Sequence, residues 1–130
     1  MTVHWTGKVV SVNSWHALRW IYEKGGRTKK KPVIAATKEY EEFIQSLSAT
    51  IAGVAFIERM IDQPRVDVRI QCSLGPRMDD QNLLKPICDA IERSGVVKND
   101  RDIGIKTIIP GERHKQGMDD HIWLFITNPD

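Results

Sequence analysis

The chain has 130 residues, of which 41% are hydrophobic and 28% charged, and its formal net charge at pH 7 is +2. A chain of this length favours one domain, residues 1–130, that folds without cross-links. No apolar run approaches the roughly 20 residues that span a bilayer. The N-terminus lacks the apolar core of a signal peptide, and two cysteines make no disulfide framework. We therefore expect no membrane partner and a cytoplasmic location.

The first part of the chain combines weak strand signals with a basic segment. Residues 2–10 alternate weakly between apolar and polar side chains, which predicts a first strand. Residues 16–23 fit either a strand or an irregular segment. The basic segment that follows contains two glycines, and it suits either a phosphate backbone or a solvated loop. Its candidate DNA-binding side chains are Lys24, Arg27, Lys29, Lys30 and Lys31.

A helix is predicted from Lys38 to about Ala52. Thr37 before it is a candidate N-cap. Gly53 either ends or kinks this helix, and residues 54–61 would continue it in the second case. The apolar side chains recur at the spacing of one helical face. This stripe consists of Tyr40, Phe43, Ile44, Leu47 and Ile51.

Three further strands are predicted. Residues 66–74 alternate between apolar and polar side chains, which indicates one buried and one solvated face. Cys72 lies on the apolar face and is interpreted as a packed core thiol. Residues 103–109 form a second strand, and residues 121–127 are apolar on both faces, as in a central strand.

Residues 79–100 carry an acidic stretch around a second predicted helix, which starts near Asn82 and ends at Gly95. At about 100° per residue, Lys85 and Asp89 fall on the face opposite the apolar side chains. Two interpretations stay open. The carboxylates are helix caps and surface partners, or they gather to hold Mg²⁺ for phosphodiester hydrolysis beside a lysine that stabilises charge.

The same stretch resembles the signature of RusA-type Holliday-junction resolvases. That signature runs Asp-x-Asp-Asn-x-x-Lys-x-x-x-Asp-Ala, then a short spacer with glycine, then Asp-Asp. Upstream, Gly7 and Val12-Asn13 resemble the opening of the family pattern without its proline, so the resemblance spans the whole chain. The positions that match without a gap are Asp79, Asn82, Lys85, Asp89, Ala90, Gly95 and Asp100.

Two positions depart from the family pattern. The second aspartate, a metal ligand in the family, falls on Gln81, and the first residue of the closing pair is Asn99. Asp80 would replace the missing ligand by a small shift of the loop, or Gln81 would coordinate more weakly through its amide oxygen.

The resemblance implies a RusA-like α+β fold, a small mixed sheet with two main helices, that forms a two-fold homodimer. It implies paired incisions in four-way DNA junctions that leave 5′-phosphate and 3′-hydroxyl ends, in a bacterial or phage-infected cytoplasm. The implied cofactor is Mg²⁺, with Mn²⁺ as a substitute. The implied metal ligands are Asp79, Asp80, Gln81 and Asp100. The implied catalytic residues are Asp79, Asp80, Lys85 and Asp100, supported by Asn82 and Asp89.

Two other functions are kept beside the nuclease. A protein of the same fold would bind branched DNA with weak or no cleavage, because Gln81 replaces a ligand aspartate. A small domain with ordinary helix caps would have no role with nucleic acids.

Overall fold

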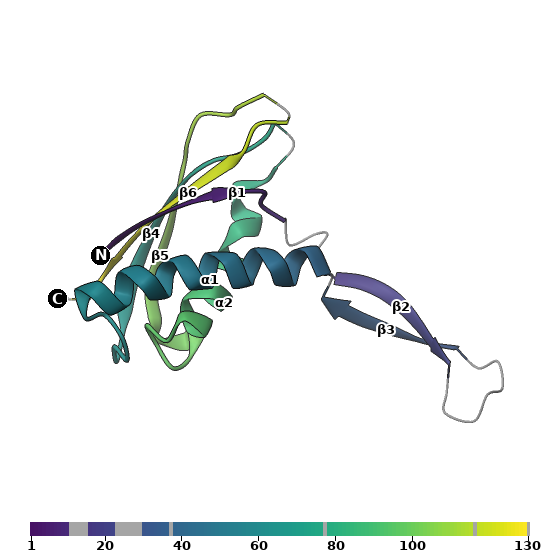
Figure 1. Cartoon of the computed structure of the whole chain (residues 1–130), viewed down its shortest axis with the longest axis horizontal. Helices are drawn as coiled ribbons and strands as arrows, with labels where there is room; N and C mark the ends of the chain where they lie inside the picture. The colour runs from purple at the N-terminus through teal and green to yellow at the C-terminus, as the bar shows by residue number, and fades with distance from the viewer. Residues whose placement is uncertain (11–15, 23–29, 37, 77, 116, 130) are drawn as a thin grey trace.

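The computed structural model describes residues 1–10, 16–22, 30–36, 38–76, 78–115 and 117–129. These ranges form an α+β fold with a mixed four-stranded sheet, a two-stranded hairpin and two α-helices (Figure 1). The predicted α+β class, with a small mixed sheet and two main helices, is therefore confirmed. In chain order the elements are β1 (Thr2–Gly7), β2 (His16–Tyr22), β3 (Lys30–Ala36), α1 (Lys38–Glu58), β4 (Val66–Ser73), the short 3₁₀ helix η1 (Asp80–Leu83), α2 (Leu84–Ser94), the short 3₁₀ helix η2 (Asp100–Asp102), β5 (Ile103–Pro110) and β6 (Asp120–Thr127).

The four-stranded sheet has the order β1-β6-β4-β5. β6 is antiparallel to both of its neighbours, and β4 and β5 are parallel. Parallel neighbours need a crossover connection, and here η1, α2 and η2 provide it. The acidic stretch is therefore the connection that returns the chain from β4 to β5.

One face of the sheet is covered by the helices. The predicted alternation in β4 is confirmed, since its apolar side chains, including Cys72, are buried. β6 is a central strand as predicted, but its two faces differ in burial. Ile122 and Leu124 are fully buried against the core, whereas Trp123 and Phe125 are only partly covered. The reason is that α1 and α2 pack together on the face of the sheet that carries Ile122 and Leu124.

The helix α1 does not end near Ala52 but continues to Glu58, which agrees with the longer of the two predicted helices. Its predicted apolar stripe is buried, and Ala55 extends it by one turn. The helix passes through Gly53 because this residue is exposed, with open space where a Cβ would stand. The predicted cap Thr37 lies outside the described residues. Neither α1 nor α2, the α-helices of the described ranges, combines the length and apolarity needed to cross a bilayer.

The strands β2 and β3 form an antiparallel hairpin, whose register runs from His16 opposite Ala36 to Tyr22 opposite Lys30. Residues 16–22 are thus a strand, which decides a question that the sequence left open. Figure 1 shows the hairpin beyond the N-terminal end of α1.

Candidate functional site

The start of the acidic stretch is a capped 3₁₀ turn. Asp79 Oδ1 accepts a hydrogen bond from the backbone N–H of Gln81 at 3.0 Å. The α-helix itself begins at Leu84 rather than near Asn82, because residues 80–83 form this tighter turn. Asp79 is therefore the N-cap of η1, as one interpretation of the sequence predicts.

The end of α2 is set by Gly95, as predicted. Its φ is 86°, a left-handed conformation that glycine adopts without a steric penalty. Ile87, Ala90 and Ile91 are buried on the inner face of the helix. This burial fixes the rotation of α2 and turns Lys85 to the outside.

Lys85 is the centre of a first charged cluster. Its Nζ lies 2.9 Å from Asp89 Oδ1 and 4.0 Å from Asp100 Oδ2. The Tyr40 hydroxyl donates to Asp89 Oδ2 at 2.9 Å. The structure thus brings Lys85, Asp89 and Asp100, three residues predicted from the sequence, into one place. Tyr40, a member of the predicted apolar stripe, is the fourth member of the cluster.

The protonation states of this cluster follow from its contacts. The hydrogen bond to Asp89 raises the pKa of Lys85 despite partial desolvation, so the ammonium stays charged. Burial, and then the hydrogen bond to Asp89, raise the pKa of Tyr40, so its phenol remains a neutral donor. The Lys85 side chain is 51% exposed. The Lys85 side chain therefore borders solvent while its Nζ contacts Asp89.

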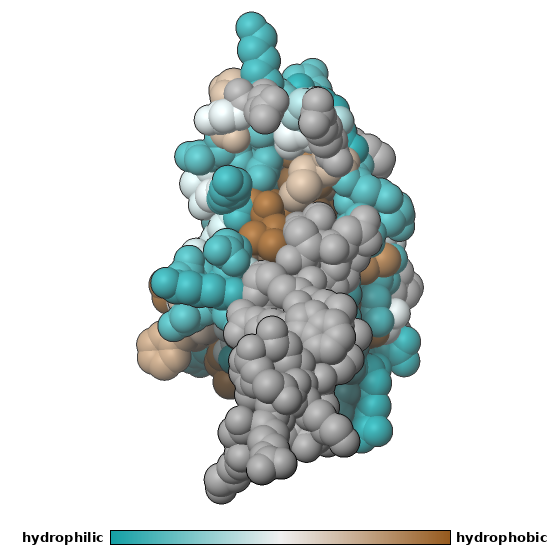
Figure 2. All heavy atoms as spheres, turned by 90° about the vertical axis from the view of Figure 1, so that its right-hand side faces the viewer, coloured by the Kyte–Doolittle hydropathy of each residue, from teal (hydrophilic) through white to brown (hydrophobic). Residues whose placement is uncertain are grey.

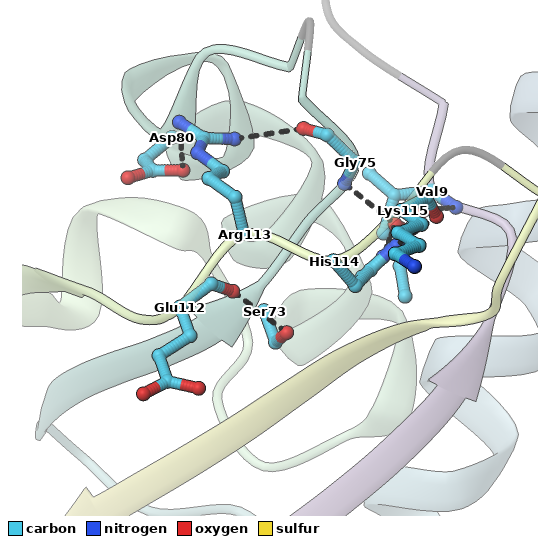
Figure 3. A network of polar contacts seen from close by, with 9 residues as sticks. Val9, Ser73, Gly75, Asp80, Glu112, Arg113, His114 and Lys115 are labelled. Carbon is cyan, nitrogen blue, oxygen red and sulfur yellow. Dashed lines mark hydrogen bonds and ion pairs between the residues drawn. The ribbon is translucent and has the colours of Figure 1, made fainter.

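Asp80 belongs to a second charged cluster (Figure 3). Its Oδ1 lies 3.1 Å from Arg113 Nη2, and Arg113 Nη1 donates to the Gly75 carbonyl at 3.1 Å. The Asp80 side chain is only 12% exposed. Burial, and then the negative charge of Asp80, raise the pKa of the Cys72 thiol to about 11. Cys72 is therefore an inert core thiol, as predicted.

A buried carboxylate that the sequence did not single out lies next to this cluster. Asp120 Oδ1 lies 2.7 Å from His114 Nε2 and accepts from Gly75 N at 3.1 Å, while its Oδ2 accepts from Val9 N at 2.9 Å. The Lys115 carbonyl and then Asp120 raise the pKa of His114. Asp120 is the first residue of β6. Its place beside an apolar strand was the only sequence signal for this role.

Asn99 and Gln81, the two departures from the family pattern, and the matching Asn82 lie in or next to the two short 3₁₀ helices. Asn99 Oδ1 accepts from the Arg101 backbone N–H at 3.2 Å and caps η2. Gln81 is exposed, and Asn82 lies in η1 with its backbone N–H on the Asp79 carbonyl at 3.1 Å.

The predicted metal ligands do not converge in this arrangement. Within the described ranges, no three His, Cys, Asp or Glu side chains lie close enough together to hold a metal ion. Carboxylate oxygens are suitable ligands for Mg²⁺, so the predicted ligands are of the right chemical type. Their positions in this structure, however, do not form a site for the ion. Asp80 faces Arg113, and Asp100 faces Lys85. A divalent cation would have to replace these positive side chains.

Two hollows adjoin the acidic stretch at Met78, the residue before Asp79. They measure about 590 Å³ and about 410 Å³, and both are lined by Gly7, Lys8, Val9 and Met78. Figure 2 shows apolar atoms at the surface of the face it presents, with hydrophilic atoms on both sides.

The structure does not describe the side chains of the predicted basic segment. Lys24, Arg27 and Lys29 lie outside the described residues. Lys30 and Lys31 belong to β3 through their backbone, and the structure does not describe their side chains.

A scan of the chain against protein-family models gave no match, and a search of curated proteins gave none at a significant level.

Proposed function

We propose that the chain is a Mg²⁺-dependent, structure-selective endodeoxyribonuclease of the RusA type, which resolves four-way DNA junctions as a homodimer. Asp79, Asp80 and Asp100 are the proposed metal ligands, with Gln81 as a substitute. Lys85 is the proposed phosphate-stabilising cation.

The observation that carries the proposal is the position of Lys85 between Asp89 and Asp100. All three residues match the family signature, and they come from α2 and η2. An ordinary surface pair would need only Asp89, four residues further along the same helix. The additional approach to Asp100 gathers the lysine and a proposed ligand of the signature around one surface.

The side chains have separable roles in this proposal. Asp89, held by the Tyr40 hydroxyl, orients Lys85 through a hydrogen bond of 2.9 Å. The half-exposed ammonium then offers a fixed positive charge to a DNA phosphate. A bound Mg²⁺ would neutralise phosphate charge and activate water.

A binding protein without efficient cleavage is the second candidate. It is favoured by the same lack of convergence, and by the absence of a negative charge at Gln81. In this case Lys85 would contact the phosphate backbone and no strand would be cut.

Incubation with a synthetic four-way junction and with matched linear duplex, with and without Mg²⁺, separates the candidates. The nuclease predicts symmetric nicks in the junction that require the metal. Tight junction binding without nicks in either Mg²⁺ or Mn²⁺ would support the binding protein. Equal binding of junction and duplex would contradict both.

The ligand assignment has its own test. Asp80→Asn should abolish nicking if Asp80 replaces the missing aspartate of the signature. Full activity of Asp80→Asn combined with loss of activity in Gln81→Ala would show that the amide of Gln81 is the ligand. Sedimentation of the wild type tests the homodimer, which should have twice the 14.8 kDa mass of the chain.

A further inference from the structure

We propose that the open face of the four-stranded sheet is the surface on which a second copy of this chain docks, in a two-fold pair of sheets that face each other. The open face is the side of the sheet opposite α1 and α2, to which His4, Arg69, Trp123 and Phe125 point. This inference rests on the homodimer of the proposed function, and it names the surface that forms it.

Burial alternates along the strands, and this alternation identifies the open face. On β1, Val3 and Trp5 are buried in the core, and His4 between them is exposed. On β6, Trp123 and Phe125 are only partly covered, while the residues on either side of them are buried. The helices α1 and α2 pack with the buried side chains on the other face. Aromatic rings therefore lie on the face that α1 and α2 leave uncovered.

The open face carries little net charge. The strands β1, β4 and β6 contain no lysine or glutamate, and Asp67 and Arg69 supply one charge of each sign on this face. A sheet face in contact with water is normally polar, whereas the cores of protein interfaces are rich in aromatic residues and poor in lysine and glutamate. A polyanion needs an excess of cations. A neutral, aromatic face therefore favours a protein partner over DNA, and it does not repel its own copy.

One end of the open face carries a cluster of three rings, those of His4, His121 and Trp123. His4 lies opposite Trp123 in the register of β1 and β6, and His4 Nε2 lies 3.0 Å from His121 Nδ1. The three rings are nearly parallel, with interplanar angles of 6–14° and centroid distances of 5.0–5.5 Å. These contacts hold the rings in place before a partner arrives, which reduces the entropy that docking would cost.

The open face also has a hollow of about 280 Å³ between β4, β5 and β6. Its walls include Arg69, Thr107, Phe125 and Thr127. The guanidinium carbon of Arg69 lies 4.7 Å from the centroid of the Phe125 ring. A cation and an aromatic surface are thus both available to a ring that enters the hollow. The hollow therefore suits an aromatic side chain of a facing molecule.

The ring cluster and the hollow are self-complementary. The cluster lies at the start of β6, at His121 and Trp123, and the hollow lies towards its end, at Phe125 and Thr127. A two-fold axis that runs between two facing sheets, at right angles to the line from cluster to hollow, brings the cluster of each copy over the hollow of the other. Such a pair uses the same surface twice, so it is closed and adds no third copy.

The size of the open face sets the expected strength of the dimer. Four strands of six to eight residues, at about 4.8 Å between strands and about 3.3 Å per residue, give a face of roughly 19 Å by 20–26 Å. This footprint of roughly 400–500 Å² per copy is smaller than the roughly 800 Å² that a standard interface buries on each partner. We therefore expect a weak dimer with a dissociation constant on the order of 10 µM.

Sedimentation equilibrium between about 1 and 100 µM tests this surface, with Gln71→Lys as the variant and Gln45→Lys as its matched control. Gln71 is exposed on the open face opposite Trp123, and Gln45 is exposed on α1. The wild type and Gln45→Lys should approach twice the 14.8 kDa mass of the chain with the same dissociation constant. Gln71→Lys should raise this constant on the order of tenfold or more, because docking buries a new charge from each copy.

A second variant removes part of the ring cluster. Trp123→Ala should also raise the dissociation constant on the order of tenfold or more, since aromatic anchors supply much of the energy of an interface. The urea midpoint shows whether each variant is folded, and Gln71→Lys decides the question if Trp123→Ala is not. A folded Gln71→Lys protein that dimerises like the wild type would overturn the open face as the interface and leave the homodimer and the nuclease intact.

The remaining outcomes separate this surface from the proposed function. A wild type that stays at 14.8 kDa up to about 100 µM would overturn the open face as a dimer surface, while symmetric nicking of a four-way junction would still support the nuclease. Binding of single-stranded oligothymidylate by a monomeric wild type, lost in Trp123→Ala, would instead give the open face to nucleobases, which stack on aromatic rings. The result expected is a dimeric wild type and Gln45→Lys beside a monomeric Gln71→Lys.

Discussion

Replacing Tyr40 with phenylalanine tests the support of the proposed site, because it removes one hydroxyl and leaves the ring in the core. Tyr40 is 1% exposed and donates to Asp89 at 2.9 Å. A hydrogen bond to a charged group contributes about 1.5–3 kcal/mol. In Tyr40→Phe, Asp89 retains its ion pair with Lys85, and its side chain is 20% exposed. Water can therefore replace part of the lost hydrogen bond from Tyr40. We therefore expect a loss near the lower end, about 1.5 kcal/mol.

Urea unfolding at neutral pH measures this loss. With an m-value of about 1.5 kcal/mol per molar, the midpoint should fall by about 1 M. Asp89→Asn and the double variant complete a mutant cycle, in which the two losses should couple by about 1 kcal/mol. An unchanged midpoint in Tyr40→Phe, or strictly additive losses, would refute the idea that this hydrogen bond braces Asp89 and Lys85.

Three further predictions concern His114, Gly111 and Gly53. The pKa of His114 is raised in the fold, so its stabilising contribution is complete below the ordinary value of about 6.5 and is lost as pH rises through the raised value. The urea midpoint should fall from about pH 6 to about pH 8, and His114→Gln should flatten this dependence; an equal slope in both proteins would contradict the assignment. Gly111→Ala should lower stability by about 2 kcal/mol or more, because its Cβ would meet the Cys72 carbonyl. Gly53→Ala should raise stability by about 0.5–1 kcal/mol, because the position is helical and open. Thermal unfolding of Gly111→Ala and Gly53→Ala measures both changes. A change in stability of the same sign in both variants would contradict the steric explanation.

The sequence predicted the elements whose periodicity is strong. The stripe that begins at Tyr40 and the alternation that ends in Cys72 are both local patterns, because burial on one face repeats along a helix or strand. The role of Gly53 could not be decided from the sequence, because a glycine that ends a helix and an exposed glycine inside a helix look alike in the sequence. The unequal faces of β6 depend on where the helices pack, which no pattern within the strand shows.

The site was predictable only in part. Lys85, Asp89 and Asp100 belong to one signature, and they lie together. Asp80 pairs with Arg113, which comes from a distant segment of the chain and leaves no periodic signal. Asp120 pairs with His114, which lies in the preceding loop. Long-range ion pairs are decided by the tertiary fold, so the occupation of Asp80 by an arginine could not be foreseen.

The most direct measurement of the proposed function is strand nicking of a four-way junction, followed on a denaturing gel in Mg²⁺. The wild type should nick at symmetric positions. Asp100→Asn should lose nicking while it keeps junction binding, and Asp102→Asn, a carboxylate change in the same 3₁₀ helix, should nick like the wild type. Nicking by Asp100→Asn at the wild-type rate, or no nicking by the wild type in Mg²⁺ or Mn²⁺, would contradict the proposed nuclease site.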